Sequence, residues 1–226
     1  MTVLLVVFTF VAFLIIDHFY SRKRLVQPMM VAMPVRQQPV SAPRLRPNIV
    51  AGFQVPDNVR YHPGHTWALS ESPNLVRVGM DDFASKLLGK IEKVALPQRG
   101  QWIRQGQKLF SVERNGVKVD MVSPIEGSVA DVNDALVADP GMAGKDAYGD
   151  GWLVTVQAPD SKTNFRNLMG GALARAWMEE AAERLQRRMP QLAGALAQDG
   201  GLAVDDLTAS LPQSEMAALA REFFLG

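Results

Sequence analysis

Glu113-Arg114-Asn115-Gly116-Val117-Lys118 contains the clearest turn signal of this 226-residue chain. Asn-Gly is the strongest short-range signal for a two-residue β-hairpin turn, because both central residues must take a positive φ angle. The flanking residues alternate between apolar and polar, as strands with one buried face do. The apolar set is Phe110, Val112, Val117 and Val119, and the polar set is Ser111, Glu113, Lys118 and Asp120. This stretch therefore predicts two antiparallel strands joined by a tight turn.

Further short strands, separated by turns that often contain glycine, surround this hairpin. Many short strands with turn signals between them are typical of a β-sandwich or barrel. One short helix, capped by Asp81 or Asp82, interrupts them. The expected strands are residues 65–69, 75–79, 91–96, 102–103, 108–113, 117–122, 127–132 and 152–157, and the expected helix is 81–88. The expected fold class is mainly β, a flattened barrel or sandwich.

Six motifs within residues 61–160 resemble the glycine cleavage system H protein, a lipoyl-carrier domain. They occur in the order of that family and cover a little under half of the chain. The motifs are His65-Thr66-Trp67, Val78-Gly79-Met80-Asp81-Asp82-Phe83-Ala84, Leu88-Gly89-Lys90-Ile91, Val94-Ala95-Leu96-Pro97 with Gly100, Ser123-Pro124-Ile125-Glu126-Gly127 with Val129 and Val132-Asn133, and Tyr148-Gly149-Asp150-Gly151-Trp152-Leu153.

The resemblance implies a barrel-sandwich hybrid fold and a carrier function. In such proteins a lipoyl group on a lysine at a hairpin tip carries an aminomethyl group and electrons between partner enzymes. The protein is then a swinging-arm substrate rather than a catalyst. This function requires a lysine on a rigid, exposed turn that the acylating enzyme and the partner enzymes can reach.

The chain departs from the family at that lysine. The resemblance implies a glutamate three residues before the modified lysine and a serine-proline pair seven residues after it. Counting forward three from Glu113 and back seven from Ser123 leads to Gly116 in both cases. Glycine has no side chain to acylate, so the position equivalent to the lipoyl acceptor lacks the amine to which a lipoyl group would be attached.

Lys118 is the only nearby lysine that could substitute as the acceptor. With a two-residue turn, Arg114 pairs with Val117 and Glu113 pairs with Lys118. Opposite charges that face each other across strands contribute a few tenths of a kcal/mol, up to about 1, so Lys118 can instead be a solvated partner of Glu113. Arg114 cannot substitute, because its guanidinium stays charged. We expect Glu113, Arg114 and Asn115 to face a partner protein.

Composition and scattered polar residues narrow the function further. A net charge of +1 argues against nucleic-acid binding by the whole domain, and the lack of cysteine excludes disulfides, thiolate metal sites and cysteine nucleophiles. No nucleophile or acid is tied to His65 by sequence, so we expect a structural or partner-facing role for it. Asp139, Asp146 and Asp150 lack the regular alternation of a calcium loop. We expect no metal site and no enzymatic activity.

The N-terminal segment predicts a membrane anchor. Val3 to Ile16 is apolar except for Thr9, and residues 1–20 are just long enough to cross a bilayer core. Arg22-Lys23-Arg24 follows directly, and the positive-inside rule then places the rest of the chain in the cytoplasm. A buried core helix is the alternative. The expected location is the inner, cytoplasmic membrane, with a single membrane pass.

Two further segments flank the expected lipoyl domain, residues 59–160. Residues 21–58 predict a linker, because they contain six prolines and, up to residue 56, six basic and no acidic residues. Residues 161–226 predict a helical extension, with helices over 164–189, capped by Thr163 or Asn164, and 212–224. These helices either pack on the barrel or on each other, or offer a docking surface.

Three functions fit these observations. The first is a membrane-anchored H-protein-like domain without a lipoyl group, acting as an interaction or scaffold module. The alternative is a functional lipoyl carrier of the glycine cleavage type modified at Lys118, whose partners are glycine-cleavage or lipoate-dependent enzymes. The third is a transport adaptor, which also joins a membrane helix to lipoyl-like strands. Such adaptors divide the lipoyl halves around a long helical hairpin, for which Gly116 to Pro124 is too short.

Overall fold

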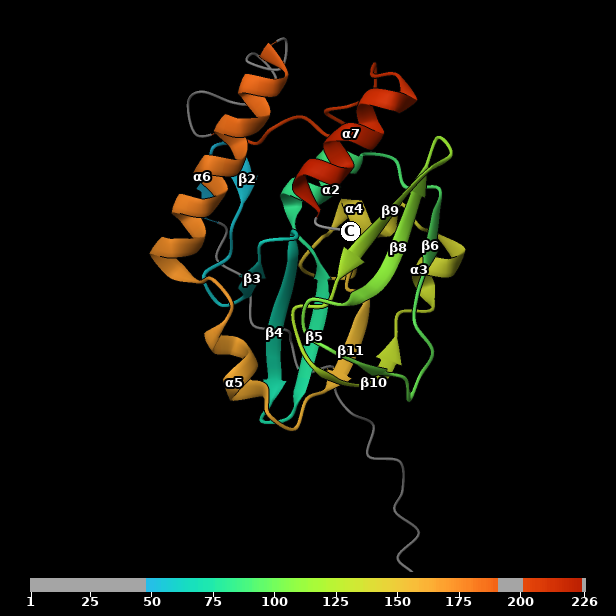
Figure 1. Ribbon diagram of the computed structural model, residues 1–226, viewed down its shortest axis with the longest axis vertical. Coiled ribbons are helices and arrows are strands. Elements are labelled where there is room, and N and C mark those ends of the chain that lie inside the picture. The colour runs from blue at the N-terminus through green and yellow to red at the C-terminus, as the bar shows by residue number, and fades with distance from the viewer. Residues whose placement is uncertain (1–47, 191–200, 225–226) are drawn as a thin grey trace, which may run out of the picture. The chain divides into compact units, whose positions relative to one another are not determined.

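The computed structural model describes residues 48–190 and 201–224, which fold into a mainly β domain with helices at its surface (Figure 1). The expected membrane anchor, residues 1–20, and the linker up to residue 47 lie outside the described residues. None of the described helices combines the length and the apolar character needed to cross a bilayer.

Three antiparallel sheets make up the β structure of the described residues. The largest has the strand order β3-β4-β5-β11-β10-β7, a three-stranded sheet has the order β6-β8-β9, and β1 pairs with β2. Side chains from the two larger sheets share one core, in which Tyr61, Trp67 and Phe110 are fully buried. The strands are β1 (Ile49–Val50), β2 (Phe53–Gln54), β3 (Arg60–His62), β4 (Thr66–Ser72), β5 (Leu75–Met80), β6 (Lys93–Ala95), β7 (Trp102–Ile103), β8 (Lys108–Arg114), β9 (Val117–Val122), β10 (Gly127–Val132) and β11 (Val154–Gln157).

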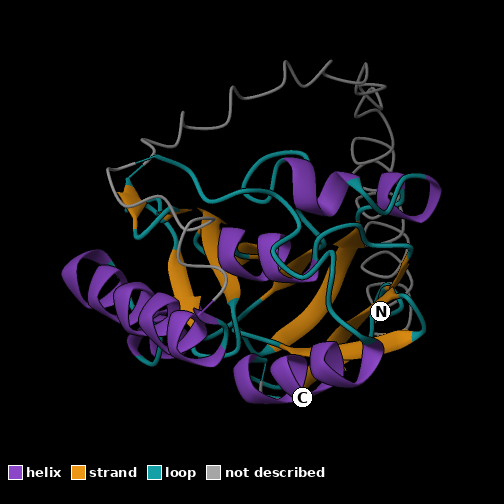
Figure 2. Cartoon of the chain, turned by 90° about the horizontal axis from the view of Figure 1, so that it is seen from above, coloured by secondary structure: helices purple, strands orange, loops and turns teal. Residues whose placement is uncertain are grey.

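The described helices are α2 (Asp82–Leu88), α3 (Ala135–Ala138), α4 (Met142–Lys145), α5 (Ser161–Arg166), α6 (Gly171–Arg188) and α7 (Gln213–Phe223). Most of them flank the strands (Figure 2), whereas α2 lies inside the domain with all of its residues buried. Asp81 caps α2, because its Oδ1 accepts a hydrogen bond from the Ala84 amide at 2.8 Å. The predicted helix and its cap are confirmed, as is the mainly β fold class.

The connection between β9 and β10 is short, running from Ser123 to Glu126. The Ser123 hydroxyl donates to the Ile125 carbonyl at 2.6 Å, which makes this connection a local turn. There is accordingly no helical hairpin between these strands of the kind that a transport adaptor requires.

The helix expected over residues 164–189 is divided into α5 and α6. Between them, Met169 exchanges two backbone hydrogen bonds of 2.9 Å with Tyr61. Gly171 then takes a φ of +55°, a left-handed conformation that ordinary helix residues avoid. Hydrophobic spacing alone concealed the break, because Met169 is apolar and fits a helical stripe. Thr163 and Asn164 lie inside α5 rather than capping a helix, and the Asn164 Oδ1 accepts from the Glu126 amide at 2.8 Å.

The end of the expected linker is also folded. Residues 49–54 form the β1–β2 ribbon, and Phe53 and Val55 are buried. Phe53 packs on Phe83 of α2 with a ring-centroid distance of 4.9 Å. The proline and basic composition, which predicts an extended linker, does not reveal these two isolated apolar residues, whose burial extends the packed domain to residues 48–58.

The C-terminal segment packs on the β domain rather than standing apart from it. Its buried residues, which belong to the same hydrophobic core as the strands, are Ala203, Leu207, Met216, Leu219, Ala220, Phe223 and Phe224. Helix α7 lies beside β9, which is an edge strand of the three-stranded sheet (Figure 1). The helical extension therefore contributes directly to the surface around the β8–β9 hairpin.

Candidate functional site

The β8–β9 hairpin has the predicted two-residue turn. Asn115 and Gly116 have φ angles of +48° and +73°, as a turn with two left-handed central residues requires. Arg114 pairs with Val117 and Glu113 pairs with Lys118, so the predicted register is confirmed. The exposed tip carries no lysine.

The outward face of the hairpin carries charged side chains with a different pairing from the expected one. Glu113 faces Lys118 in the strand register, but its Oε1 forms its ion pair with Lys93 Nζ of β6 at 3.1 Å. Lys118 is exposed and has no ion-pair partner among the described residues. The expectation that Glu113 engages Lys118 is therefore corrected, since the neighbouring strand supplies another lysine. Within the described residues Lys118 is an amine without an ion pair, at the second position of β9 and two residues from Gly116.

Arg114 does not face solvent as expected, but points into the protein. Its side chain is only 7% exposed and lies 2.6 Å from the Asp206 carboxylate. Its Nη1 also donates to the Leu88 carbonyl at 2.5 Å and to the Thr208 hydroxyl at 2.9 Å. The alternation in β8 could have revealed this orientation, because Arg114 follows Val112 by two residues and shares its face.

Arg114 and the segment from Asp206 to Thr208 together complete the C-terminal end of α2. The Leu207 amide donates to the Lys86 carbonyl at 2.9 Å, and the Thr208 hydroxyl donates to the Leu87 carbonyl at 2.8 Å. Helix ends leave such carbonyls without partners, and a positive charge there is favourable. The arrangement requires glycine at position 89, because a Cβ atom would collide with Asp206 and Arg114.

Helix α7 reaches the hairpin tip itself. A Cβ atom placed on Gly116 would lie 3.1 Å from Nε2 of Gln213, the first residue of α7. Beside this point, α7 and β9 border an open pocket of about 260 Å³ whose lining includes Lys118, Asp120 and Arg221. The position equivalent to the family's lysine thus faces another part of the same chain.

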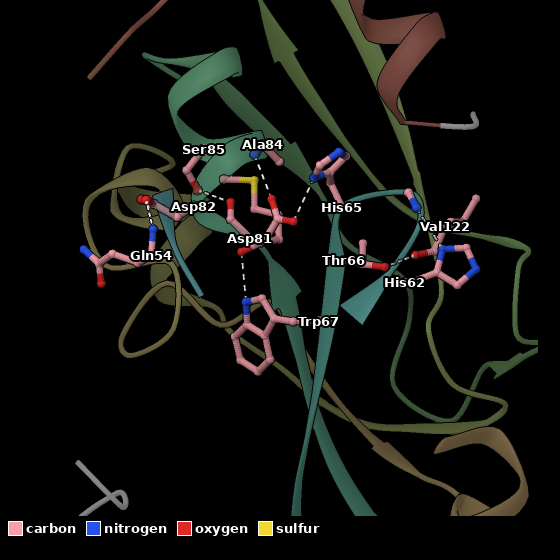
Figure 3. Close-up of polar contacts among 12 residues, drawn as sticks. Gln54, His62, His65, Thr66, Trp67, Asp81, Asp82, Ala84, Ser85 and Val122 are labelled. Carbon is pink, nitrogen blue, oxygen red and sulfur yellow. Dashed lines mark hydrogen bonds and ion pairs between the residues drawn. The ribbon is translucent and has the colours of Figure 1, made fainter. Parts of the chain in front are cut away.

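A buried histidine–aspartate pair lies beneath the same face (Figure 3). His65 Nδ1 is 2.8 Å from Asp81 Oδ2, and the two side chains are 1% and 0% exposed. The His65 ring stacks on Phe83 at 4.3 Å and packs against Trp177 at 4.6 Å. Sequence reasoning did not pair His65 with this acid, which directly follows the next strand, β5, as the N-cap of α2. Because the pair is buried and also caps α2, the geometry supports a structural role.

Burial also shifts the pKa of other titratable groups near α2. Burial raises the pKa of Asp82 despite its hydrogen bond from Lys86 at 2.8 Å. Burial likewise raises the pKa of Tyr61 and Tyr148 above their ordinary value. Tyr148 donates to the Gln54 carbonyl at 2.8 Å, so it joins the β1–β2 ribbon to the domain. Asp82, Tyr61 and Tyr148 therefore help to pack the fold and do not line an open site.

The aspartates considered for a calcium loop organise turns instead. Asp146 accepts from the amides of Gly149 at 3.1 Å and Asp150 at 3.0 Å, and Asp139 accepts from the Gly141 amide at 3.1 Å. Within residues 48–190 and 201–224, no cluster of three or more histidine, cysteine or acidic side chains is placed to hold a metal ion.

Comparison with known proteins identifies the family of the folded domain. Residues 59–181 match the family model described as "Glycine cleavage H-protein". A curated "Glycine cleavage system H protein" from Anaeromyxobacter sp. (strain K) is 34% identical over 128 residues, covering 57% of this chain and 98% of the relative. The Xanthomonas euvesicatoria pv. vesicatoria (strain 85-10) protein of the same name is 36% identical over 109 residues, covering 48% and 83%.

Among solved structures, a glycine cleavage system H protein from Mycobacterium marinum matches with a TM-score of 0.48 and 28% identity, covering 54% of this chain and 97% of that one. The family model and the curated relatives define the class of protein: a domain of the H-protein type, with additional residues on both sides of the matched region. The chain belongs to the glycine cleavage H-protein family.

Proposed function

We propose that this chain is a membrane-tethered H-protein-like domain that carries no lipoyl group and acts as an interaction or scaffold module. The observation that carries the proposal is the hairpin tip, where both family spacings lead to Gly116 and the turn offers no amine. Residues 1–20 provide the tether in this proposal, with the folded domain in the cytoplasm. Its partners are proteins, including enzymes of the glycine cleavage type, and it catalyses no reaction itself.

The intact mass of the protein tests the absence of the lipoyl group. The full chain is expressed in a host that lipoylates its own carrier proteins, and its mass is expected to equal that of the unmodified polypeptide. The host's own H protein, isolated from the same cells, is the control for active lipoylation. A lipoyl adduct on any lysine of this chain would contradict the proposal.

Lys118 supports a second candidate function, a lipoyl carrier with a displaced acceptor. The amine is exposed and has no ion-pair partner among the residues described here. Against this function, Lys118 lies in the extended part of β9 and beside α7 rather than on the turn. A lipoate-attaching enzyme can therefore reach Lys118 less easily than it could reach a lysine at the tip of the turn.

A lipoylation assay separates the two candidate functions. If Lys118 is the acceptor, lipoate ligase labels the wild type and the Lys108→Arg variant but not Lys118→Arg. Lys108 is a matched control, because it is an exposed lysine on the same sheet and forms an ion pair with Asp120 at 2.8 Å. Absence of labelling in all three chains supports the non-lipoylated module.

A further inference from the structure

We propose that residues 203–224, here called the C-terminal arm, form a latch that closes the hairpin face from within the same chain. The latch covers the edge of β9 and so restricts how lysine-modifying enzymes and other proteins can approach the tip, even when an acceptor lysine is present there. This inference rests on the proposed function, in which the hairpin corresponds to a former carrier site. Its test does not depend on whether the wild type is modified.

The first fastening point of the latch is polar. Arg114 of the hairpin contacts both Asp206 and Thr208 of the arm, and Leu207 and Thr208 bond to carbonyls of α2. Asp206 has a φ of +62°, so the chain turns sharply at the residue that meets the arginine. One hairpin residue therefore connects the arm and α2, and the arm cannot leave without breaking these bonds.

The second fastening point is apolar. Phe223 packs on Phe83 of α2 at 5.1 Å between ring centroids, and Phe224 meets the edge of the His65 ring at 5.9 Å. Leu219 and both phenylalanines are buried in the core. Removing these apolar side chains from water stabilises the docked arm.

The docked arm covers a strand edge to which a strand of another chain could otherwise bind. β9 is an edge strand of its sheet, and an open edge presents unpaired backbone groups to other chains. Helix α7 lies along this edge, and its first residue, Gln213, adjoins Gly116 at the tip. The arm therefore covers the edge of β9, whereas Asn115 and Gly116 at the tip stay exposed and Gly116 meets the arm at the Gln213 side chain.

The latch can open without unfolding the domain. Helix α7 has only 11 residues, and a helix of this length is marginal in water without its packing partners. Loss of the polar fastening at Asp206 and Thr208 weakens the docking of the arm, and the proposal requires that the strands stay folded when the arm leaves the shared core. Local opening of such a segment is measurable by hydrogen exchange.

A lysine introduced at the tip provides the test. Gly116→Lys is combined with the latch variant Asp206→Asn/Thr208→Val, and separately with the control Asp205→Asn, which removes a charge from the neighbouring exposed residue. Each full-length chain is incubated with lipoate ligase, lipoate and ATP. We expect slow labelling of Gly116→Lys alone and of the control, and labelling faster by about tenfold or more in the latch variant.

Hydrogen exchange on the same chains measures the latch itself. The latch variant is expected to exchange faster in residues 203–224 while β4, β5 and β11 stay protected, which also shows that the domain is folded. Equal labelling with the intact and the weakened latch overturns the inference. So does unchanged exchange of the arm in the latch variant, or an arm that opens while the introduced lysine stays unlabelled.

Discussion

At the β8–β9 turn, two neighbouring residues have opposite environments. Asn115 is exposed and adopts the left-handed conformation of the turn, whereas Arg114 is buried under the C-terminal arm. A buried guanidinium is tolerated only when its donors are satisfied, and Arg114 meets a carbonyl, a hydroxyl and a carboxylate. The residue that resemblance placed at a partner-facing position thus has a partner within its own chain.

Arg114→Met tests this contribution to stability. The substitution keeps much of the side-chain volume but leaves the Leu88 carbonyl and the Asp206 carboxylate without their cation. We expect the free energy of unfolding to fall by about 2 kcal/mol or more, because hydrogen bonds to charged groups are worth about 1.5–3 kcal/mol. Urea unfolding measures the change. Arg104→Met, at an exposed arginine of the same domain, is the control and should stay within about 0.5 kcal/mol of wild type.

His62 gives the domain a pH dependence of known sign. Burial lowers its pKa below the ordinary value of 6.5, and its Nδ1 accepts a hydrogen bond from the Gly64 amide at 3.1 Å. Below pH 6.5 the His62 side chain is protonated in the unfolded chain, whereas in the folded chain it stays neutral down to a lower pH. The contribution of His62 to stability is therefore fully present above pH 6.5 and is lost as the pH falls through the lowered pKa of the folded chain.

Urea unfolding between about pH 8 and about pH 5 checks this expectation. The free energy of unfolding should decline on the acid side in the wild type, and His62→Gln should flatten that part of the profile. An imidazole titration followed by NMR gives the pKa directly. A midpoint at or above 6.5 for His62 would show that burial does not control its ionisation.

At the scale of elements, local patterns predict the hairpin well and its surroundings poorly. Asn115-Gly116 and the alternation around it define the turn and the register, because both are properties of neighbouring residues. The inward direction of Arg114 follows from the same alternation, but its partner Asp206 does not. That contact depends on how a distant segment returns to the domain, which spacing and composition do not encode.

The same distinction explains the other differences from expectation. The break between α5 and α6 is caused by pairing of Met169 with Tyr61, and the fold of residues 48–58 by burial of Phe53 and Val55. Both are long-range contacts that override a local pattern. The register of the candidate site and the helix expected over residues 212–224, observed as α7, were accessible to sequence reasoning, whereas the position of α7 beside β9 was not.

Leu219→Ala tests how far α7 depends on its packing. Leu219 is 3% exposed, and truncating a buried leucine typically costs about 2–5 kcal/mol. We expect this cost mainly in the docking of α7, so the amides of residues 213–223 should lose most of their protection in native-state hydrogen exchange. The control Ser214→Ala changes an exposed residue of the same helix and should leave protection unchanged. Uniform loss of protection in β4 and β5 would show instead that α7 and the domain unfold as one unit.

At the scale of the whole molecule, the family domain is only part of the chain. The family match ends at residue 181, and the arm that covers the hairpin lies beyond it. The chain before residue 59 contains the apolar segment and the basic residues that the proposed tether requires. Helix α7 covers the edge of β9 beside the hairpin. In the proposed function, residues 1–20 add the membrane attachment.

Membrane fractionation tests the proposed tether. The full chain is expected in the membrane fraction, resistant to high salt, because about 20 apolar residues suffice to span a bilayer core. Removal of residues 1–20 should release the protein, while Arg22→Gln/Lys23→Gln/Arg24→Gln should leave it membrane-bound but disturb its orientation. A reporter fused after Gly226 measures that orientation and should be active in the cytoplasm for the wild type. Release of the full chain by salt would reduce the attachment to surface electrostatics, and a reporter active outside the cytoplasm would reverse the proposed topology.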